Sequence, residues 1–148
     1  MSCEEVSFTF PMIADVYYAS TEQGPYGGVV KTWFKSKTVV GNFTYLGPDT
    51  KEEVKPNIDI TLKSDLLGRV KSDIRISPSG LMHNITNIVV TNIRDCNGNQ
   101  FYLETAGARS GKPTIFEIAT QQPFVNPFGK AEHYRLVLRR TENQGDIL

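Results

Sequence analysis

The stretch Ile85–Thr105 constrains the fold more than any other part of the chain. It reads ITNIVVTNIRDCNGNQFYLET, with two runs rich in β-branched and aromatic residues, Ile85–Ile93 and Phe101–Thr105, on either side of Asp95–Asn99. The dipeptide Asn97-Gly98 in that segment is among the strongest short-range hairpin signals, because both residues tolerate the positive φ of a tight turn. The sequence therefore predicts a β-hairpin here, with both runs as strands of the barrel wall.

Alternation of apolar and polar residues predicts further strands before and after this hairpin. Glycine and proline clusters between them predict turns and loops. The expected strands are Val6–Tyr18 (interrupted at Pro11), Val29–Tyr45, Val70–Ile76, Thr114–Ala119 and His133–Arg140, and the expected loops include Ala19–Gly28, Ala106–Pro113 and Gln121–Gly129.

The strand count and the chain length indicate one all-β domain. Seven or eight short antiparallel strands without an amphipathic helix of normal length are typical of a small β-barrel or sandwich. Val29–Tyr45 is expected as one long strand or a bent pair, and Gly41 inside it predicts a bulge or a bend, as in strands that curl around a small barrel. A chain of 148 residues fits a single domain spanning residues 1–148, whose polar end, Thr141–Leu148, is expected to be flexible and to fray.

Two segments interrupt the strand pattern. Gly47–Gly68 is a long irregular loop of mixed charge, and loops of this length inside a compact domain are uncommon and often functional. An ordinary edge hairpin is the alternative. In Gln121–Gly129, Phe124 and Phe128 each follow a proline, so a stiffened loop would present both rings for docking to a partner at low entropic cost. Capping one end of the barrel is the alternative for these rings. The single tryptophan, Trp33, is expected in the core or at a subunit interface.

Two segments imitate binding loops without completing them. Gly107–Thr114 suggests a phosphate loop, but Pro113 follows the lysine where a P-loop requires Ser or Thr. In the turn Asp95–Asn99, oxygen-bearing side chains alternate as in a calcium loop, but Ala106 stands where a bidentate Glu is needed. Both segments are therefore interpreted as turns.

The remaining titratable residues indicate no catalytic or metal site. His83 and His133 have no Cys or His partner at metal-ligand spacing. Glu104 and Glu117 lie on different expected strands and can face each other as an acid–base pair, although such residues more often line an exposed face beside Lys or Arg. We predict a protein that is not an enzyme and that uses no metal or cofactor.

Charge and cysteine content limit the partners further. Lys plus Arg and Asp plus Glu are both 16, and zero net charge argues against a dedicated nucleic-acid binder and leaves copies poorly protected from self-association. Cys3 and Cys96, one near the terminus and one in a turn, are interpreted as reduced thiols of a cytosolic protein. The first residues lack a secretory signal and no apolar run spans a bilayer, so no membrane partner is expected.

Several short segments between Asp15 and Arg140 carry a resemblance to a known family. They are Asp15-Val-Tyr-Tyr before a glycine-rich turn, a strand with Lys31-Thr-Trp33, a long charged loop, a strand ending Asp73-Ile-Arg75 and a hairpin ending Asn99-Gln-Phe-Tyr102. This arrangement resembles the head-closure (stopper) or head–tail joining proteins of tailed-phage necks. The N-terminal run and everything after about Gly107 depart from the usual short form. These departures leave three interpretations open: stopper, adaptor or tail-terminator-like ring protein.

The resemblance implies a structural virion component. Such a protein is a small β-barrel that forms a six-fold homo-oligomer ring in the virion neck, assembled in the host cytoplasm between the portal or adaptor and the tail. The loop Gly47–Gly68 would project into the channel, help retain packaged DNA and touch it transiently and without sequence preference. Zero net charge suits a conduit through which DNA slides. The candidate channel residues are Lys51, Glu52, Glu53, Lys55, Asp59 and Lys63. The competing interpretation is a stand-alone β-barrel binding module for a small ligand or peptide.

Overall fold

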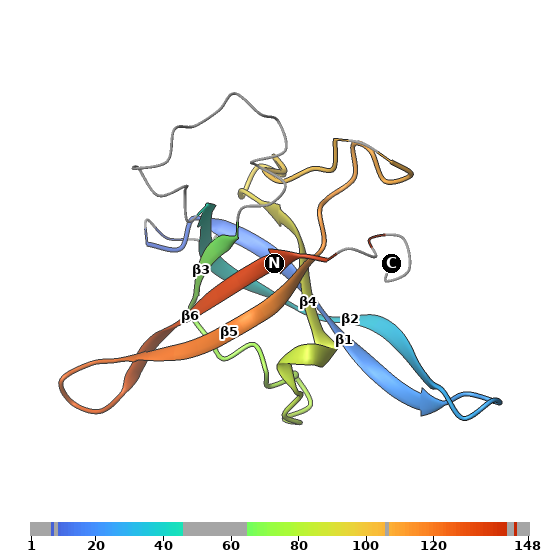
Figure 1. The fold of residues 1–148 in the computed structure, drawn as a ribbon. Coiled ribbons are helices and arrows are strands. Elements are labelled where there is room, and N and C mark those ends of the chain that lie inside the picture. The colour runs from blue at the N-terminus through green and yellow to red at the C-terminus, as the bar shows by residue number, and fades with distance from the viewer. Residues whose placement is uncertain (1–6, 8, 46–64, 106, 142–143, 145–148) are drawn as a thin grey trace, which may run out of the picture.

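Six strands form one antiparallel sheet that closes into a barrel (Figure 1). The computed structural model describes residues 7, 9–45, 65–105, 107–141 and 144. The order of strands around the barrel is β1-β2-β3-β6-β5-β4. The expected all-β fold, a small barrel or sandwich, is thus confirmed, with six named strands in the described residues in place of the expected seven or eight. In chain order the elements are β1 (Met12–Gln23), β2 (Val29–Tyr45), β3 (Leu66–Val70), the 3-10 helix η2 (Ile85–Asn87), β4 (Ile88–Arg94), β5 (Phe116–Val125) and β6 (Ala131–Arg140).

The core is built from inward-facing side chains of every strand. In β6, Leu136 and Leu138 are fully buried while their neighbours are more exposed, because successive residues of a strand point to opposite faces. Burial of each such side chain contributes about 1.5–3 kcal/mol. The described chain contains no helix that is long and apolar enough to cross a bilayer. The core cluster includes Val16, Tyr18, Phe43, Leu66, Val70, Ile88, Val90, Phe116, Leu136 and Leu138.

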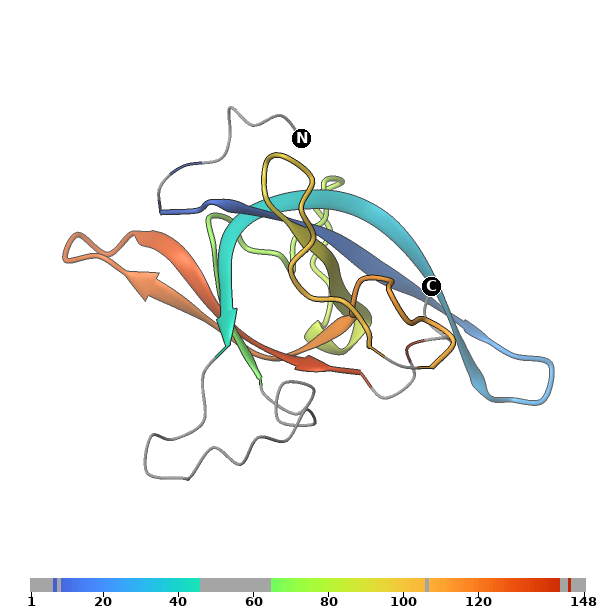
Figure 2. The ribbon, with the colours of Figure 1, turned by 90° about the horizontal axis from the view of Figure 1, so that it is seen from above.

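Gly41 marks the bend that the sequence predicts in β2. β2 pairs with β1 from Val29 to Gly41 and with β3 from Gly41 to Tyr45, so the strand passes from one neighbour to the next at this glycine. A Cβ atom here would lie 2.6 Å from the carbonyl oxygen of Arg69, which no real side chain tolerates. Figure 2 shows the strong curvature of β2 around the barrel. The bounds of β2 match the predicted strand Val29–Tyr45.

The predicted central hairpin is correct in one strand and wrong in the other. β4 forms, and the turn after it is closed by hydrogen bonds from Asp95 N to Asn99 O and from Gly98 N to Asp95 O. The residues 101–105 form no named strand. The returning segment bonds to β4 only at its start, through the bridge between Arg94 and Gln100 and the hydrogen bond from Phe101 N to Ile93 O, and it then pairs with residues 112–114. Residues 101–105 lie instead near the core, where the Tyr102 hydroxyl donates to Phe43 O at 2.5 Å.

The predicted strand Val70–Ile76 is also wrong, since β3 ends at Val70 and the residues that follow form bends and a turn. Side chains replace the missing strand partner: the Tyr18 hydroxyl donates to Ile74 O at 2.6 Å, and Lys37 Nζ donates to Ile76 O at 2.7 Å. Three predicted loops have wrong bounds, because β1 continues to Gln23, β5 continues to Val125, and β3 begins at Leu66, inside the expected loop Gly47–Gly68.

Three further expectations need correction or restriction. Cys96 is disulfide-bonded, so its interpretation as a reduced thiol is wrong; the other cysteine, Cys3, lies outside the described residues. Gln144, in the end expected to be flexible and to fray, is buried and its amide nitrogen donates to Ile115 O at 2.8 Å. The prediction that the chain end frays is therefore wrong at Gln144, because its side-chain amide forms hydrogen bonds with the backbone N–H and carbonyl of Ile115. Trp33 is half-buried and does not belong to the core.

Candidate functional site: two hairpin arms and a pocket

Two hairpins extend beyond the barrel wall as two-stranded ribbons. The β1–β2 arm comprises residues 19–34, and the β5–β6 arm comprises residues 121–134. β4 pairs with β1 only between Ile13 and Tyr18, and β3 pairs with β6 only between Tyr134 and Leu138. Figure 1 shows both arms projecting from the barrel in different directions. In the described chain, each arm therefore has a free edge on both sides.

The tips of the two arms share one sequence pattern and one geometry. Gly24-Pro-Tyr-Gly-Gly28 and Asn126-Pro-Phe-Gly-Lys130 each place an aromatic residue between a proline and a glycine of positive φ. In both tips the first residue's N–H donates to the fifth residue's carbonyl, and the fourth residue's N–H donates to the first residue's carbonyl. The exposed fractions of the two rings are 99% for Tyr26 and 87% for Phe128. Each arm thus presents an aromatic ring on a hydrogen-bonded turn.

The inner face of the barrel wall continues onto the β1–β2 arm. Val16 pairs with Lys37 and Tyr17 pairs with Lys35, so Ser36 is an extra residue that changes the phase of β2. After this bulge Phe34 lies opposite the buried Tyr18. Phe34 and Val30, on the same face, are exposed because the barrel core ends beneath them. The arm therefore carries apolar side chains on the face that is buried in the barrel wall, but on the arm no other described residues cover them.

The β5–β6 arm is apolar as well, and aromatic stacking orders it. The Phe124 and His133 rings stack with centroids 4.7 Å apart and an interplanar angle of 10°. Phe10 contacts the same histidine at 6.5 Å in an edge geometry. At the tip, Asn126 Oδ1 accepts hydrogen bonds from the N–H groups of Phe128 and Lys130. The arm is a built hairpin rather than the open loop that the sequence suggests.

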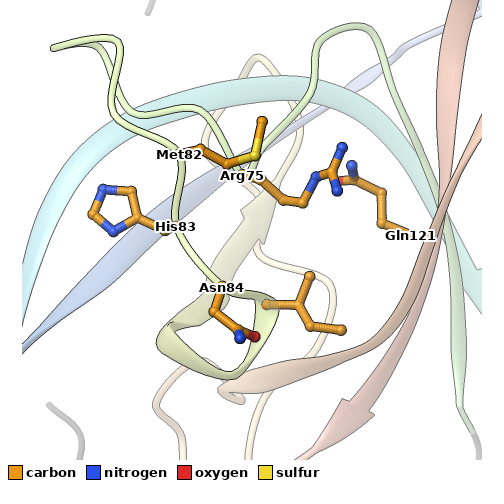
Figure 3. Close-up of a pocket in the computed structure, with 6 residues that line it drawn as sticks. Arg75, Met82, His83, Asn84 and Gln121 are labelled. Carbon is orange, nitrogen blue, oxygen red and sulfur yellow. The ribbon is translucent and has the colours of Figure 1, made fainter.

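A pocket of about 530 Å³ lies between the segment 75–85 and β5 (Figure 3). It is lined by Arg75, Met82, His83, Asn84, Ile85 and Gln121. In Figure 3 the Arg75 side chain runs toward Gln121. Within the described chain no three His, Cys, Asp or Glu side chains converge to hold a metal ion.

Hydrogen bonds fix the rim of this pocket. Arg75 donates to both carboxylate oxygens of Asp73, at 3.2 and 2.9 Å, and Gln121 Nε2 donates to the same carboxylate at 2.8 Å. Burial alone would raise the pKa of Asp73, but these hydrogen bonds and the Arg75 charge lower it below the usual range. His83 packs on the Tyr18 ring, with centroids 4.5 Å apart. Arg75 is therefore held as a cation at the edge of the pocket.

The other titratable residues singled out from the sequence are structural. Glu104 does not face Glu117: its buried carboxylate accepts hydrogen bonds from Arg140 and from Thr114 Oγ1, the latter at 2.8 Å. Glu117 is exposed on β5, where its cross-strand neighbours are Val89 and Arg139. The acid–base pair expected as one possibility is therefore not formed.

The sequence singled out one arm and missed the other. Phe124 and Phe128 lie on the β5–β6 arm and are exposed, while their docking role stays a prediction. The candidate channel residues Lys51, Glu52, Glu53, Lys55, Asp59 and Lys63 lie outside the described residues. The missed residue is Tyr26, although the Pro-aromatic-Gly pattern that it shares with Phe128 was a visible signal.

Comparison with known proteins gives little. No protein-family model and no curated protein matches the chain. Among solved structures, the solution structure of protein SF1141 from Shigella flexneri 2a is similar, with 12% identity over 93% of this chain and 98% of that chain. The TM-score is 0.43, which is too low to assign a shared fold.

Proposed function

We propose that this protein is a structural subunit of a tailed-phage neck, in a ring that lies between the portal or adaptor and the tail, closes the channel and retains packaged DNA. The sequence segments quoted above supply the phage resemblance. The observation that carries an assembly role is the pair of arms, whose apolar side chains are left uncovered by the closed barrel. Contiguous exposed apolar residues on a soluble protein mark contact surfaces for other chains.

The two ends of the barrel wall have different tasks in this proposal. The loop between β2 and β3, with the charged residues from Lys51 to Lys63, enters the channel and touches packaged DNA without sequence preference. The β5–β6 arm, with Phe124 and Phe128, docks on the portal, adaptor or tail protein. Its stiff tip keeps the entropic cost of docking low.

The test is DNA retention in assembled particles. Particles made without the protein should package DNA and then lose it, and particles made with a chain lacking Asp49–Ser64 should form necks that leak. Retained DNA in both would refute the gating role. DNA-filled heads with tails of abnormal length would instead indicate a tail terminator, and heads that bind no neck protein would indicate an adaptor.

The pocket beside Arg75 favours a second candidate, a stand-alone β-barrel binding module for a small ligand or peptide. Ligand sites are concave, about 300–1,000 Å³ in volume, and combine apolar and polar groups, as this pocket does. Co-sedimentation of the purified protein with portal or tail protein separates the two functions. Binding of either protein supports the neck subunit, and absence of binding to both favours the module.

A further inference from the structure

The β1–β2 arm carries exposed apolar side chains that its own barrel does not cover. A two-stranded ribbon is marginally stable at best in water unless its apolar face is covered. On this arm Val29 is 72% exposed, and Val30 and Phe34 are about half exposed. The ribbon therefore needs a surface that its own barrel does not supply.

Tyr26 has the properties of an anchor that enters a pocket. Pro25 restricts the backbone before it, Gly27 has a φ of 83°, and the hydrogen bond from Gly27 N to Gly24 O closes the turn. A tyrosine has few rotatable bonds and a large apolar ring, so it gains much contact area at small entropic cost. Aromatic anchors of this kind dominate the binding energy of protein interfaces.

The pocket beside Arg75 has the chemistry to receive that ring. Arg75 can lie against the ring face as a cation–π partner, and the Met82 sulfur can contact its edge. Ile85 supplies an apolar wall, and the exposed carboxamide of Asn84 can hydrogen-bond to the phenol oxygen. The polar groups favour a tyrosine over a phenylalanine, and hence Tyr26 over Phe128.

We propose that Tyr26 of one copy inserts into the Arg75–Met82–Ile85 pocket of a second copy, and that the β1–β2 arm thereby joins neighbouring subunits. This deepens the proposed function, on which it rests for the existence of a ring. Tyr26 is almost fully exposed, so it does not occupy the pocket of its own chain. Arm tip and pocket are different surfaces, so in the head-to-tail arrangement that a ring requires, the contact is heterologous and repeats from copy to copy until the ring closes.

The size and charge of the surfaces suit a second copy as the occupant. An aromatic side chain buries about 150–250 Å², so Tyr26 with the exposed parts of Val30 and Phe34, which share one face of the arm, would bury on the order of 300–400 Å² per copy. With the facing surface, the total is on the order of 600–800 Å², the size of a weak, concentration-dependent contact. Zero net charge places no long-range repulsion between copies.

The experiment measures self-association of the full chain by sedimentation velocity, from about 1 to about 200 µM. Tyr26→Ala removes the anchor, and Met82→Asp places a carboxylate in the pocket beside Arg75. Each change should weaken self-association at least about 30-fold, as removal of a hot-spot residue does. Phe128→Ala is the matched control, since it removes the equivalent ring from the other arm and should leave self-association unchanged.

A mixture of the two defective variants gives the decisive result. Tyr26→Ala keeps an intact pocket and Met82→Asp keeps an intact anchor, so the mixture should form heterodimers that grow no further, while each variant alone stays monomeric. Both positions are exposed, so a matching thermal unfolding curve confirms that the variants fold. A wild type that is monomeric at 200 µM, an unaffected Tyr26→Ala variant, or a mixture without heterodimers would overturn the contact.

The contact and the neck function fail in different ways. If particles retain DNA without this protein, the neck function is refuted while the self-association data still support the contact. If rings assemble from the Tyr26→Ala variant and particles retain DNA, the contact is refuted and the neck function stands.

Discussion

Tyr18 shows how one buried hydroxyl positions a segment that has no strand partner. Its single O–H donates mainly to Ile74 O at 2.6 Å, with Ile76 O farther away at 3.3 Å. Burial, with a smaller effect from Asp73, raises its pKa, so that the phenol stays a neutral donor. Tyr18→Phe should lower the free energy of unfolding by about 1–2 kcal/mol, because the buried Ile74 carbonyl loses its donor, while Ile76 O keeps the hydrogen bond from Lys37. Urea unfolding measures the change, with Tyr26→Phe as an exposed control that should shift it by less than about 0.5 kcal/mol. Equal stability of both variants would contradict the assignment.

Glu104 should make stability depend on pH in the acid range. Burial would raise its pKa, but hydrogen bonds from Arg140 and Thr114, with the charges of Arg140 and Arg109, outweigh burial and lower it. A folded pKa below the unfolded value of about 4.3 contributes stability that is complete above that pH and is lost as pH falls through the folded pKa. Glu104→Gln should therefore cost about 2 kcal/mol at pH 7 and progressively less toward pH 3.

The matched control for this pH dependence is Glu117→Gln, a change of an exposed glutamate on β5. Chemical unfolding at several pH values measures both variants against the wild type. The Glu117→Gln difference should be small, and it should not follow the Glu104→Gln curve. A Glu104→Gln difference that stays constant between pH 7 and pH 3 would refute the ion-pair explanation.

Residue-level reasoning predicted which side chains are buried in β6 better than which residues bind a partner. Leu136 and Leu138 alternate with polar residues, and periodicity reveals them because burial depends on one strand and its face. Tyr26 lies in the expected loop Ala19–Gly28, but the sequence does not show that it forms the tip of a projecting arm. The length of that arm depends on where β4 stops pairing with β1. That distance is set by the closed barrel, not by the local sequence.

At the scale of the strand, Gly41 is the position where a side chain cannot be added. A Cβ would approach Arg69 O to 2.6 Å and two side chains to about 3.0–3.1 Å, and the backbone there is held by pairing on both sides. Gly41→Ala should destabilise the barrel by about 1–3 kcal/mol, as overpacking does. Gly28→Ala is the control, because nothing lies within 4 Å of its Cβ position. Thermal unfolding that ranks the two variants equally would contradict this explanation of the bend.

The strand predictions differ in accuracy for a physical reason. The predicted bounds of β2 are correct, because its long alternating run, with one glycine, forms a strand that pairs along its whole length. Val70–Ile76 alternates as clearly but forms no strand after Val70, because hydrogen bonds from Tyr18 and Lys37 satisfy its carbonyls. Phe101–Thr105 has strand composition, yet after the hydrogen bond from Phe101 N to Ile93 O it leaves β4 and bonds to residues 112–114. Alternation of apolar and polar residues shows that a segment can form a strand. The pairing partners that the folded chain offers decide whether it does.

At the scale of the whole molecule, the closed barrel predicts that the long connection between β2 and β3 is separable from folding. Tyr45 and Leu66 are cross-strand partners, so removal of Asp49–Ser64 leaves Leu46, Gly47, Pro48 and Asp65 to join them. A connection of about four residues is a common hairpin length. Shortening the loop also lowers the entropic cost of closing it on folding, which favours the folded state by about 1 kcal/mol.

The deletion variant should therefore unfold at the same temperature as the wild type or a few degrees higher, with unchanged self-association through the β1–β2 arm. Differential scanning calorimetry and sedimentation velocity measure the two properties. If the variant is also unable to retain DNA in particles, the loop acts in the channel and not in the barrel, because fold and assembly are intact. A variant that fails to fold would show that the connection stabilises the barrel, and it would remove the basis for treating the loop as a separate functional element.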